Sequence, residues 1–154
     1  MRTIWWKKGK VVLIDQTKLP SEEKYIETDD YRRVAEAIKV LSVRGAPAIG
    51  VAAAYGMALA AAQSSAKGTP DFLKELDKAA EVLGTTRPTA VNLFWAIDRM
   101  RMKANANSHL AVSRLKRVLR EEAEAIAEEE LAMSKKMGEF GAKLVKSGDN
   151  ILHH

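Results

Sequence analysis

The stretch that decides the fold is residues 46–62, which read APAIGVAAAYGMALAAA. Nearly every position is small or apolar, so a helix made from it has no polar face to turn toward water. These 17 residues are short for a membrane span, and their Ala and Gly content favours a closely packed buried helix. We predict this helix from Pro47 to about Gln63, at the centre of the domain. A stripe of small residues at four-residue spacing should let another backbone approach closely: Ala48, Ala52, Gly56 and Ala60.

Upstream of this segment, the sequence indicates a small antiparallel sheet. Residues 3–6 and 10–14 flank Lys7-Lys8-Gly9, a pattern that predicts a hairpin, and a third strand is expected at 23–27. The pair Trp5-Trp6 beside lysines is compatible with stacking on nucleic-acid bases. Because neighbouring strand residues face opposite ways, we expect instead that one of the two rings lies in the core.

The rest of the chain has helical periodicity. A helix is expected from about Tyr31, with Thr28 or Asp29 as its N-cap, and another is expected to open at Pro70 and close at Gly84. Thr85–Pro88 should open a fourth helix, and Ser108–Val145 should form one long helix or two joined near Gly138. The residues expected to be buried in the fourth helix include Val91, Phe94, Trp95 and Ile97. The predicted fold class is therefore α+β, a hairpin plus a third strand followed by a helical bundle.

Composition narrows the function classes. The 154 residues fit one domain, and 47% hydrophobic with 29% charged residues is typical of a globular protein. The absence of cysteine excludes a disulfide scaffold, a cysteine-ligated zinc site and a thiol nucleophile within these residues. The net charge of +5 is spread along segments in which acidic and basic residues alternate, so we predict neither a nucleic-acid nor a membrane partner. The N-terminus lacks an apolar leader segment, and we expect a cytoplasmic protein.

Two segments share an arrangement of residues that favours anion binding. Arg44-Gly45-Ala46-Pro47 and Thr85-Thr86-Arg87-Pro88 each place an arginine just before a predicted helix. Free N–H groups and the positive dipole end of a helix N-terminus attract phosphate, and the arginine fork matches phosphate oxygens. Gly45 removes the side chain where a phosphate would approach the backbone. Each segment is also compatible with an ordinary turn or cap, so the residues alone indicate only a candidate phosphate site.

No catalytic constellation is complete within the chain. Asp15, Asp29 and Asp98 are interpreted as turn, cap or surface residues, and His109 as exposed. Neither common Gly-rich nucleotide loop occurs, and we predict no cofactor and no metal. His153-His154 could be native or the remnant of a purification tag, and a metal pair without a third ligand is less favoured.

At these same residues the chain resembles methylthioribose-1-phosphate isomerases, a family related to the regulatory subunits of translation initiation factor 2B. The resemblance is carried by residues 43–56, VRGAPAIGVAAAYG, and 86–96, TRPTAVNLFWA. Residues 13–20, LIDQTKLP, and 137–142, MGEFGA, fit the same pattern. The resemblance implies an aldose–ketose isomerase of methionine salvage that converts 5-methylthioribose 1-phosphate to 5-methylthioribulose 1-phosphate. It also implies that Arg44, Gly45, Ala46 and Arg87 contact the substrate.

Members of that family are about twice as long and carry a Rossmann-like second domain with a catalytic cysteine and aspartate. By resemblance, residues 1–147 are an N-terminal domain, and residues 148–154 begin the first strand of the second. We therefore expect no catalytic residue and no activity in the chain itself, and a homodimer for the full-length protein. The alternatives are a ribose 1,5-bisphosphate isomerase and a non-catalytic regulatory subunit related to initiation factor 2B.

Overall fold

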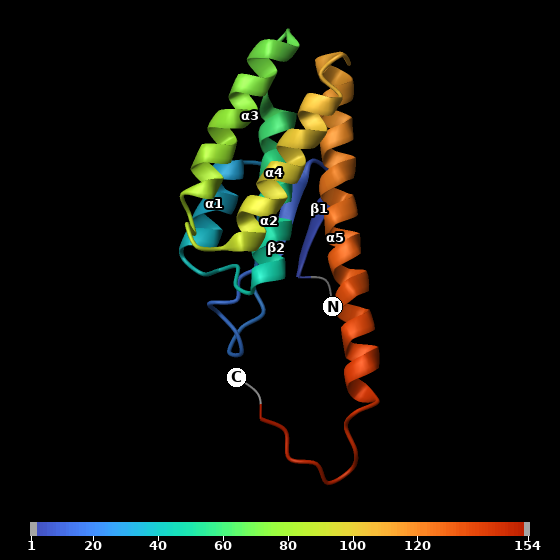
Figure 1. Cartoon of the computed structure of the whole chain (residues 1–154). Helices are drawn as coiled ribbons and strands as arrows, with labels where there is room; N and C mark the ends of the chain where they lie inside the picture. Colours follow the sequence, from blue (N-terminus) through green and yellow to red (C-terminus); the bar gives the residue numbers. More distant parts are fainter. Residues whose placement is uncertain (1–2, 153–154) are drawn as a thin grey trace.

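The computed structural model describes residues 3–152 and has the predicted α+β architecture, a small sheet beside a helical bundle (Figure 1). Three short strands come first: β1 (Ile4–Lys7), β2 (Lys10–Ile14) and β3 (Tyr25–Thr28). The helices follow: α1 (Tyr31–Lys39), α2 (Ala46–Gln63), α3 (Thr69–Gly84), α4 (Val91–Ala106) and α5 (Val112–Ala142).

The sheet is antiparallel with β2 in the middle. Its hairpin turns at Lys8 and Gly9, both with positive φ, and Leu13 of β2 pairs with Ile4 on one side and Ile26 on the other. Trp6 packs toward Tyr55 of α2, with ring centroids 6.3 Å apart, while Trp5 meets Tyr25 edge-on at 5.5 Å. The two indole rings do face opposite ways, and both remain partly exposed.

Two boundaries near β3 differ from prediction. The third strand lies at Tyr25–Thr28 instead of 23–27. The N-cap of α1 is Asp30, not Thr28 or Asp29, because the Asp30 carboxylate accepts a 2.9 Å hydrogen bond from the backbone N–H of Arg32. The Thr28 hydroxyl has a different task and accepts from the Asp30 backbone N–H at 3.0 Å.

Helix α2 is the central element, as predicted. It is buried without interruption from Ile49 to Ala61 and contacts all four other helices as well as β1 and β2. The close backbone approach occurs at Gly50, where an added Cβ would lie 3.0 Å from the backbone oxygen of Asn92 in α4. At Gly56, within the predicted stripe, the neighbour is instead the side chain of Leu83.

Helix α4 begins later and buries another face than predicted. A turn over residues 87–90, closed by a 3.0 Å hydrogen bond from Ala90 N–H to the Arg87 carbonyl, separates the arginine from the helix. Val91 is 78% exposed, and Phe94 and Trp95 are also exposed, so three of the four predicted core positions are wrong. The buried side chains are spaced by three and four residues: Leu93, Ala96, Ile97, Met100 and Ala104. Both faces of this helix carry apolar residues, and periodicity alone could not choose between them.

Helix α5 is one continuous helix of 31 residues. Only its first half is packed, through Leu115, Leu119 and Ile126, whereas Met137 and Phe140 of the same predicted seam are exposed. Figure 1 shows this second half running past the rest of the domain, followed by an extended tail. Residues 150–152 form no strand and do not join the sheet, and His153-His154 lie outside the described residues.

Candidate functional site

The two arginine segments lie at one end of the bundle. Helices α2 and α4 both start at the lower end of the domain in Figure 1. The two helices are in contact near their starts, because Gly50, the fifth residue of α2, lies against the backbone of Asn92 in α4. Segments 44–47 and 85–88, about 40 residues apart in sequence, are thereby brought to the same end, which is the arrangement that a shared anion site requires.

Gly45 shapes the start of α2. It is the N-cap, with φ 91° and ψ 130°, a backbone conformation that side-chain-bearing residues rarely adopt. Its carbonyl accepts the first helical hydrogen bond, from Ile49 N–H at 3.0 Å. Within residues 3–152, no acceptor lies in hydrogen-bonding range of the N–H groups of Ala46 and Ala48. These two groups are available to an anion at the positive end of the helix dipole.

Arg44 is exposed but held in place. Its Nη2 donates to the Gln16 carbonyl at 3.0 Å, and Gln16 Nε2 donates back to the Arg44 carbonyl at 3.2 Å. The preceding residue, Asp15, is a turn residue as predicted: its pKa is lowered, chiefly because the Thr17 hydroxyl donates to its carboxylate at 2.7 Å. The loop between β2 and β3 therefore orients Arg44 and leaves its remaining N–H groups unpaired within the described part of the chain.

Arg87 is half-buried, and within residues 3–152 its side chain has no hydrogen-bond or ion-pair partner. The hydroxyl groups of its neighbours Thr85 and Thr86, in contrast, already donate hydrogen bonds within the domain. Thr85 Oγ1 donates to the Val82 carbonyl at 3.0 Å and Thr86 Oγ1 to the Leu83 carbonyl at 2.6 Å. Both threonine hydroxyls therefore satisfy carbonyl groups at the C-terminal end of α3.

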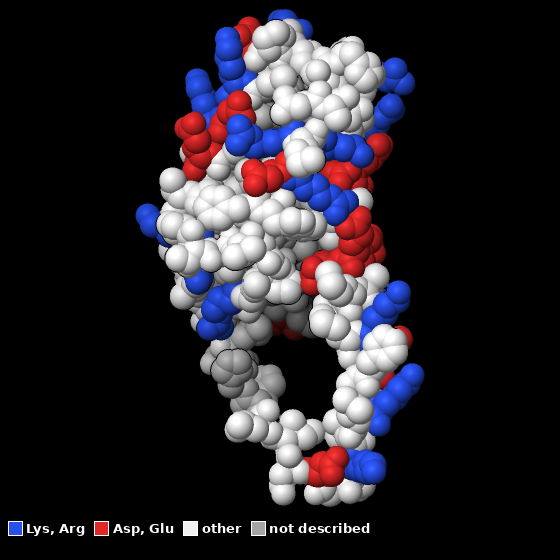
Figure 2. Space-filling model, viewed as in Figure 1, with Lys and Arg blue, Asp and Glu red and all other residues white. Residues whose placement is uncertain are grey.

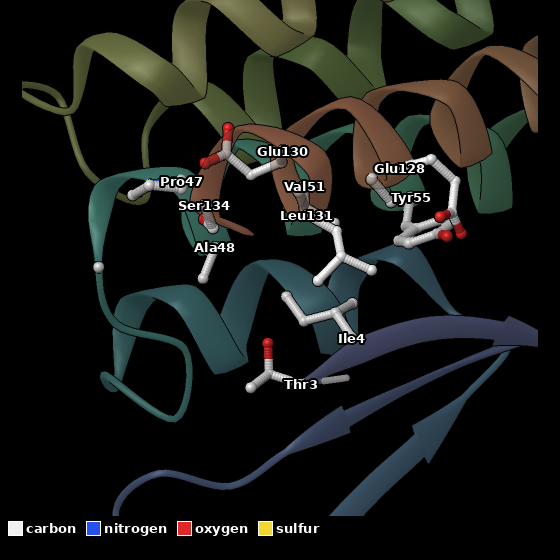
Figure 3. Close-up of a pocket in the computed structure, with 12 residues that line it drawn as sticks. Thr3, Ile4, Pro47, Ala48, Val51, Tyr55, Glu128, Glu130, Leu131 and Ser134 are labelled. Carbon is white, nitrogen blue, oxygen red and sulfur yellow. The ribbon is translucent and has the colours of Figure 1, made fainter. Parts of the chain in front are cut away.

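A groove of about 330 Å³ runs from Gly45 along α2 (Figure 3). Its walls come from the start of β1, from α2 and from the middle of α5. Ile4, Val51 and Leu131 provide apolar surface, and Glu130 and Ser134 lie near Pro47 at one end. Sequence reasoning missed this groove, because no local pattern links Ile4 to Leu131 across more than 120 residues.

The other titratable residues considered in the sequence lie on the surface. Asp29, Asp98 and His109 are exposed, as predicted for surface residues. No group of three or more His, Asp or Glu side chains in residues 3–152 is arranged to hold a metal ion. Gly45, which follows Arg44 and caps α2, also lines the apolar groove.

Comparison with known sequences decides the family. The family model described as "Initiation factor 2 subunit family" matches residues 42–154, which contain both arginine segments. The chain belongs to the initiation factor 2 subunit family. Within this family the curated relatives are named methylthioribose-1-phosphate isomerase. The one from Geobacter metallireducens is 51% identical over 153 residues, covering 99% of this chain and 44% of its own length. The one from Desulforamulus reducens is 47% identical over 154 residues, again 44% of its length.

Solved structures show the same fold. The crystal structure of 5-methylthioribose 1-phosphate isomerase from Pyrococcus horikoshii superposes with a TM-score of 0.91 at 44% identity, covering 96% of this chain and 41% of that one. A structure titled translation initiation factor eIF-2B, subunit delta, from A. fulgidus gives 0.87 at 45% identity, covering 97% and 43%. The resemblance inferred from the motifs is confirmed, and the chain spans less than half the length of the relatives it matches.

Proposed function

We propose that this chain is the N-terminal, substrate-binding part of a methylthioribose-1-phosphate isomerase. The observation that carries the proposal is the position of the Arg44-Gly45 and Arg87 segments at the same end of the bundle, in a chain 51% identical to an enzyme of that name. Arg44, the N–H groups around Ala46, and Arg87 would hold the phosphate of 5-methylthioribose 1-phosphate. Gly45 would let that phosphate approach the backbone.

The chemistry of the reaction explains why the longer protein would need two domains, each supplying part of the active site. A phosphate on C1 prevents the sugar ring from opening as a free hemiacetal does. Isomerisation to 5-methylthioribulose 1-phosphate moves a hydrogen between C1 and C2, which needs acid–base groups in a pocket that excludes water. Residues 1–154 would supply the anion clamp. The acid–base groups, a cysteine and an aspartate by resemblance, would come from a Rossmann-like second domain, so this chain alone would be inactive.

The proposal also covers the ligand, the oligomeric state and the cellular location of the longer protein. A small-molecule sugar phosphate is the partner, the longer protein is a homodimer in the cytoplasm, and neither nucleic acid nor membrane is involved. Acidic and basic side chains are interspersed on the face shown in Figure 2, which supports the absence of a nucleic-acid track. Helix α2 is long and apolar enough to cross a membrane, but 67% of it is buried inside the domain. Light scattering of the longer protein tests the dimer.

The decisive experiment assays the product of the complete reading frame for conversion of 5-methylthioribose 1-phosphate. Arg44→Ala and Arg87→Ala should each lower kcat/KM about 10- to 100-fold, the effect of losing a charge-assisted hydrogen bond. Arg114→Ala is the matched control, since Arg114 is exposed near the start of α5, at the opposite end of the bundle. Unchanged kinetics in both site variants would remove these arginines from the site.

A second candidate is a non-catalytic regulatory subunit. It is favoured by the 45% identity to the structure titled as a subunit of eIF-2B. This reading predicts that the complete protein lacks isomerase activity and binds a nucleotide-exchange complex. Turnover of the sugar phosphate by the unaltered protein would exclude it, and ribose 1,5-bisphosphate in the same assay tests the remaining alternative.

A further inference from the structure

Gln16, in the loop between β2 and β3, is joined to the Arg44 segment by three hydrogen bonds. Its backbone N–H donates to the Ser42 carbonyl at 3.0 Å, and its side-chain Nε2 donates to the Arg44 carbonyl at 3.2 Å. In return, Nη2 of Arg44 donates to the Gln16 carbonyl at 3.0 Å. One residue of an early loop therefore holds both the main chain and the side chain of an arginine that lies 28 residues later.

The hydrogen bond from the Gln16 side chain fixes the orientation of the peptide between Arg44 and Gly45. That peptide is trans, so its N–H points away from the carbonyl that Gln16 holds. Within residues 3–152, the Gly45 N–H has no hydrogen-bond acceptor, and neither has the next N–H along the chain, that of Ala46. Gln16 therefore directs an unpaired donor away from its own loop at the start of α2.

The loop that carries Gln16 is itself held by hydrogen bonds. The Asp15 carboxylate accepts from the Thr17 N–H at 3.1 Å and from the Thr17 hydroxyl at 2.7 Å. The Asp15 N–H donates to the Lys24 carbonyl at 2.8 Å, at the other end of the same loop. Asp15 and Gln16 are half-buried, whereas Arg44 is exposed. The exposed arginine is therefore attached to an ordered loop instead of extending freely into solvent.

This attachment matters for anion binding because an arginine side chain has many rotamers. An unrestrained guanidinium loses that freedom when it binds a phosphate, and the loss of entropy weakens binding. The Gln16 carbonyl takes only one of the guanidinium N–H groups, so the others remain for phosphate oxygens. Arg44 is thereby oriented before the anion arrives and keeps most of its donors.

We infer that Gln16 is a positioning residue of the candidate anion site. It orients the Arg44 guanidinium and the Arg44–Gly45 peptide toward the phosphate of the substrate, and it does not contact the substrate itself. This inference rests on the proposed function. It adds to the site a residue that neither an arginine nor a helix start identifies in the sequence.

The first test measures KM and kcat for 5-methylthioribose 1-phosphate in the protein from the complete reading frame. Gln16→Met removes the amide donor and keeps the length of the side chain. KM should rise about 5- to 10-fold with kcat changed less than about two-fold, because the phosphate contact is the same in the ground state and the transition state. Gln63→Met, the same substitution at the exposed last residue of α2, is the matched control and should change neither constant.

Two further measurements make the test independent of turnover and of the folding of one variant. Binding of inorganic phosphate, measured by calorimetry, should weaken about 3- to 10-fold in Gln16→Met and stay the same in Gln63→Met. Gln16→Asn retains the amide on a shorter side chain, which no longer reaches the Arg44 carbonyl, and it should also raise KM.

A double-mutant cycle separates positioning from a merely structural role. Because Gln16 acts through Arg44, Gln16→Met should raise KM less in an Arg44→Ala background than in the unaltered enzyme. A role elsewhere in the fold would give the same fold-change in both backgrounds.

The outcomes distinguish the two proposals. A complete protein that does not turn over the sugar phosphate overturns the proposed function, and phosphate calorimetry then decides the role of Gln16. An active protein in which Gln16→Met and Gln16→Asn leave KM and phosphate binding unchanged overturns the positioning role and leaves the function standing. Equal effects of Gln16→Met with and without the Arg44 side chain overturn it too, because Gln16 would then not act through that arginine.

Discussion

At the residue scale, Gly45 shows how a backbone conformation prepares a site. The Cβ of any other residue would meet nothing within 4 Å, so space is not the constraint. The constraint is the φ of 91°, which strains a residue that carries a side chain. The glycine therefore sets the direction from which the chain enters α2 and holds Arg44 beside the helix start.

This constraint predicts the effect of Gly45→Ala. The variant should lose about 1–3 kcal/mol of unfolding free energy, the usual strain of such a conformation. Gly138→Ala is a matched control, because its Cβ also meets nothing but its backbone is helical, so it should gain roughly 0.5–1 kcal/mol. Urea denaturation of the two variants measures both changes. Equal effects would show that the backbone at Gly45 is unstrained.

At the element scale, the contact between α2 and α4 brings the starts of these two helices to the same end of the bundle. Gly50→Ala would place a Cβ 3.0 Å from the Asn92 backbone oxygen, which cannot move without shifting the start of α4. We predict a loss of about 1–3 kcal/mol, as for overpacking of a core. Gly56→Ala meets only the flexible end of Leu83 and should cost less. A larger loss for Gly56→Ala in thermal unfolding would contradict this ranking.

The contact between α4 and α5 is held by an ion-pair cluster. Arg99 Nε donates to Glu122 Oε1 at 2.6 Å and its Nη2 to Glu129 Oε1 at 2.8 Å, while Lys103 Nζ lies 2.8 Å from Glu122 Oε2. Burial opposes ionisation of Glu122, but hydrogen bonds from Lys103 and Arg99 and their charges lower its pKa overall. Arg99 lowers the pKa of Glu129 by the same kind of hydrogen bond.

These lowered pKa values predict a pH dependence of stability. A carboxylate with a lowered pKa stabilises the fold above its unfolded value, near 4.5, and this contribution is lost as the pH falls through the folded value. Glu122→Gln should therefore be about 1–2 kcal/mol less stable than the parent at pH 7. The difference should shrink as the pH is lowered below about 4.5. Thermal unfolding from pH 7 to pH 3 checks it, and a pH-independent difference would exclude the charge as the cause.

At the scale of the whole molecule, α5 has two unlike halves. Its first half completes the core with Leu115, Leu119 and Ile126, whereas Met137 and Phe140 are 58% and 66% exposed. The apolar seam keeps the same helical spacing throughout, and the packing changes only because the other helices end.

This asymmetry predicts how substitutions on α5 act in the 154-residue chain. Met137→Lys with Phe140→Lys should alter its unfolding free energy by no more than about 0.5 kcal/mol, as for exposed positions. Leu119→Ala should cost about 2–5 kcal/mol, because it empties a buried site. Chemical denaturation compares the two, and a large loss in the double lysine variant would mean that the second half of α5 is packed.

Local patterns predicted much of the fold. The length, burial and central position of α2 follow from an apolar run that has no polar face, and the hairpin follows from its turn residues. Arg44 and Arg87 were also identified from their place ahead of helices, although the turn at 87–90 and the use of Thr85 and Thr86 at the end of α3 were missed. Those details depend on where a neighbouring helix ends, and the residues of the two arginine segments do not determine that.

The sequence by itself determined where the five helices and the three strands lie to within a few residues, and which two segments carry cations suited to an anion, because these depend on neighbours within a few residues. Only the tertiary structure decided that α2 and α4 start side by side, that Ile4, Val51 and Leu131 enclose a groove next to Gly45, and which face of α4 is buried. These features arise from contacts between residues far apart in the chain, and helical periodicity gives no information about which partner a face will meet.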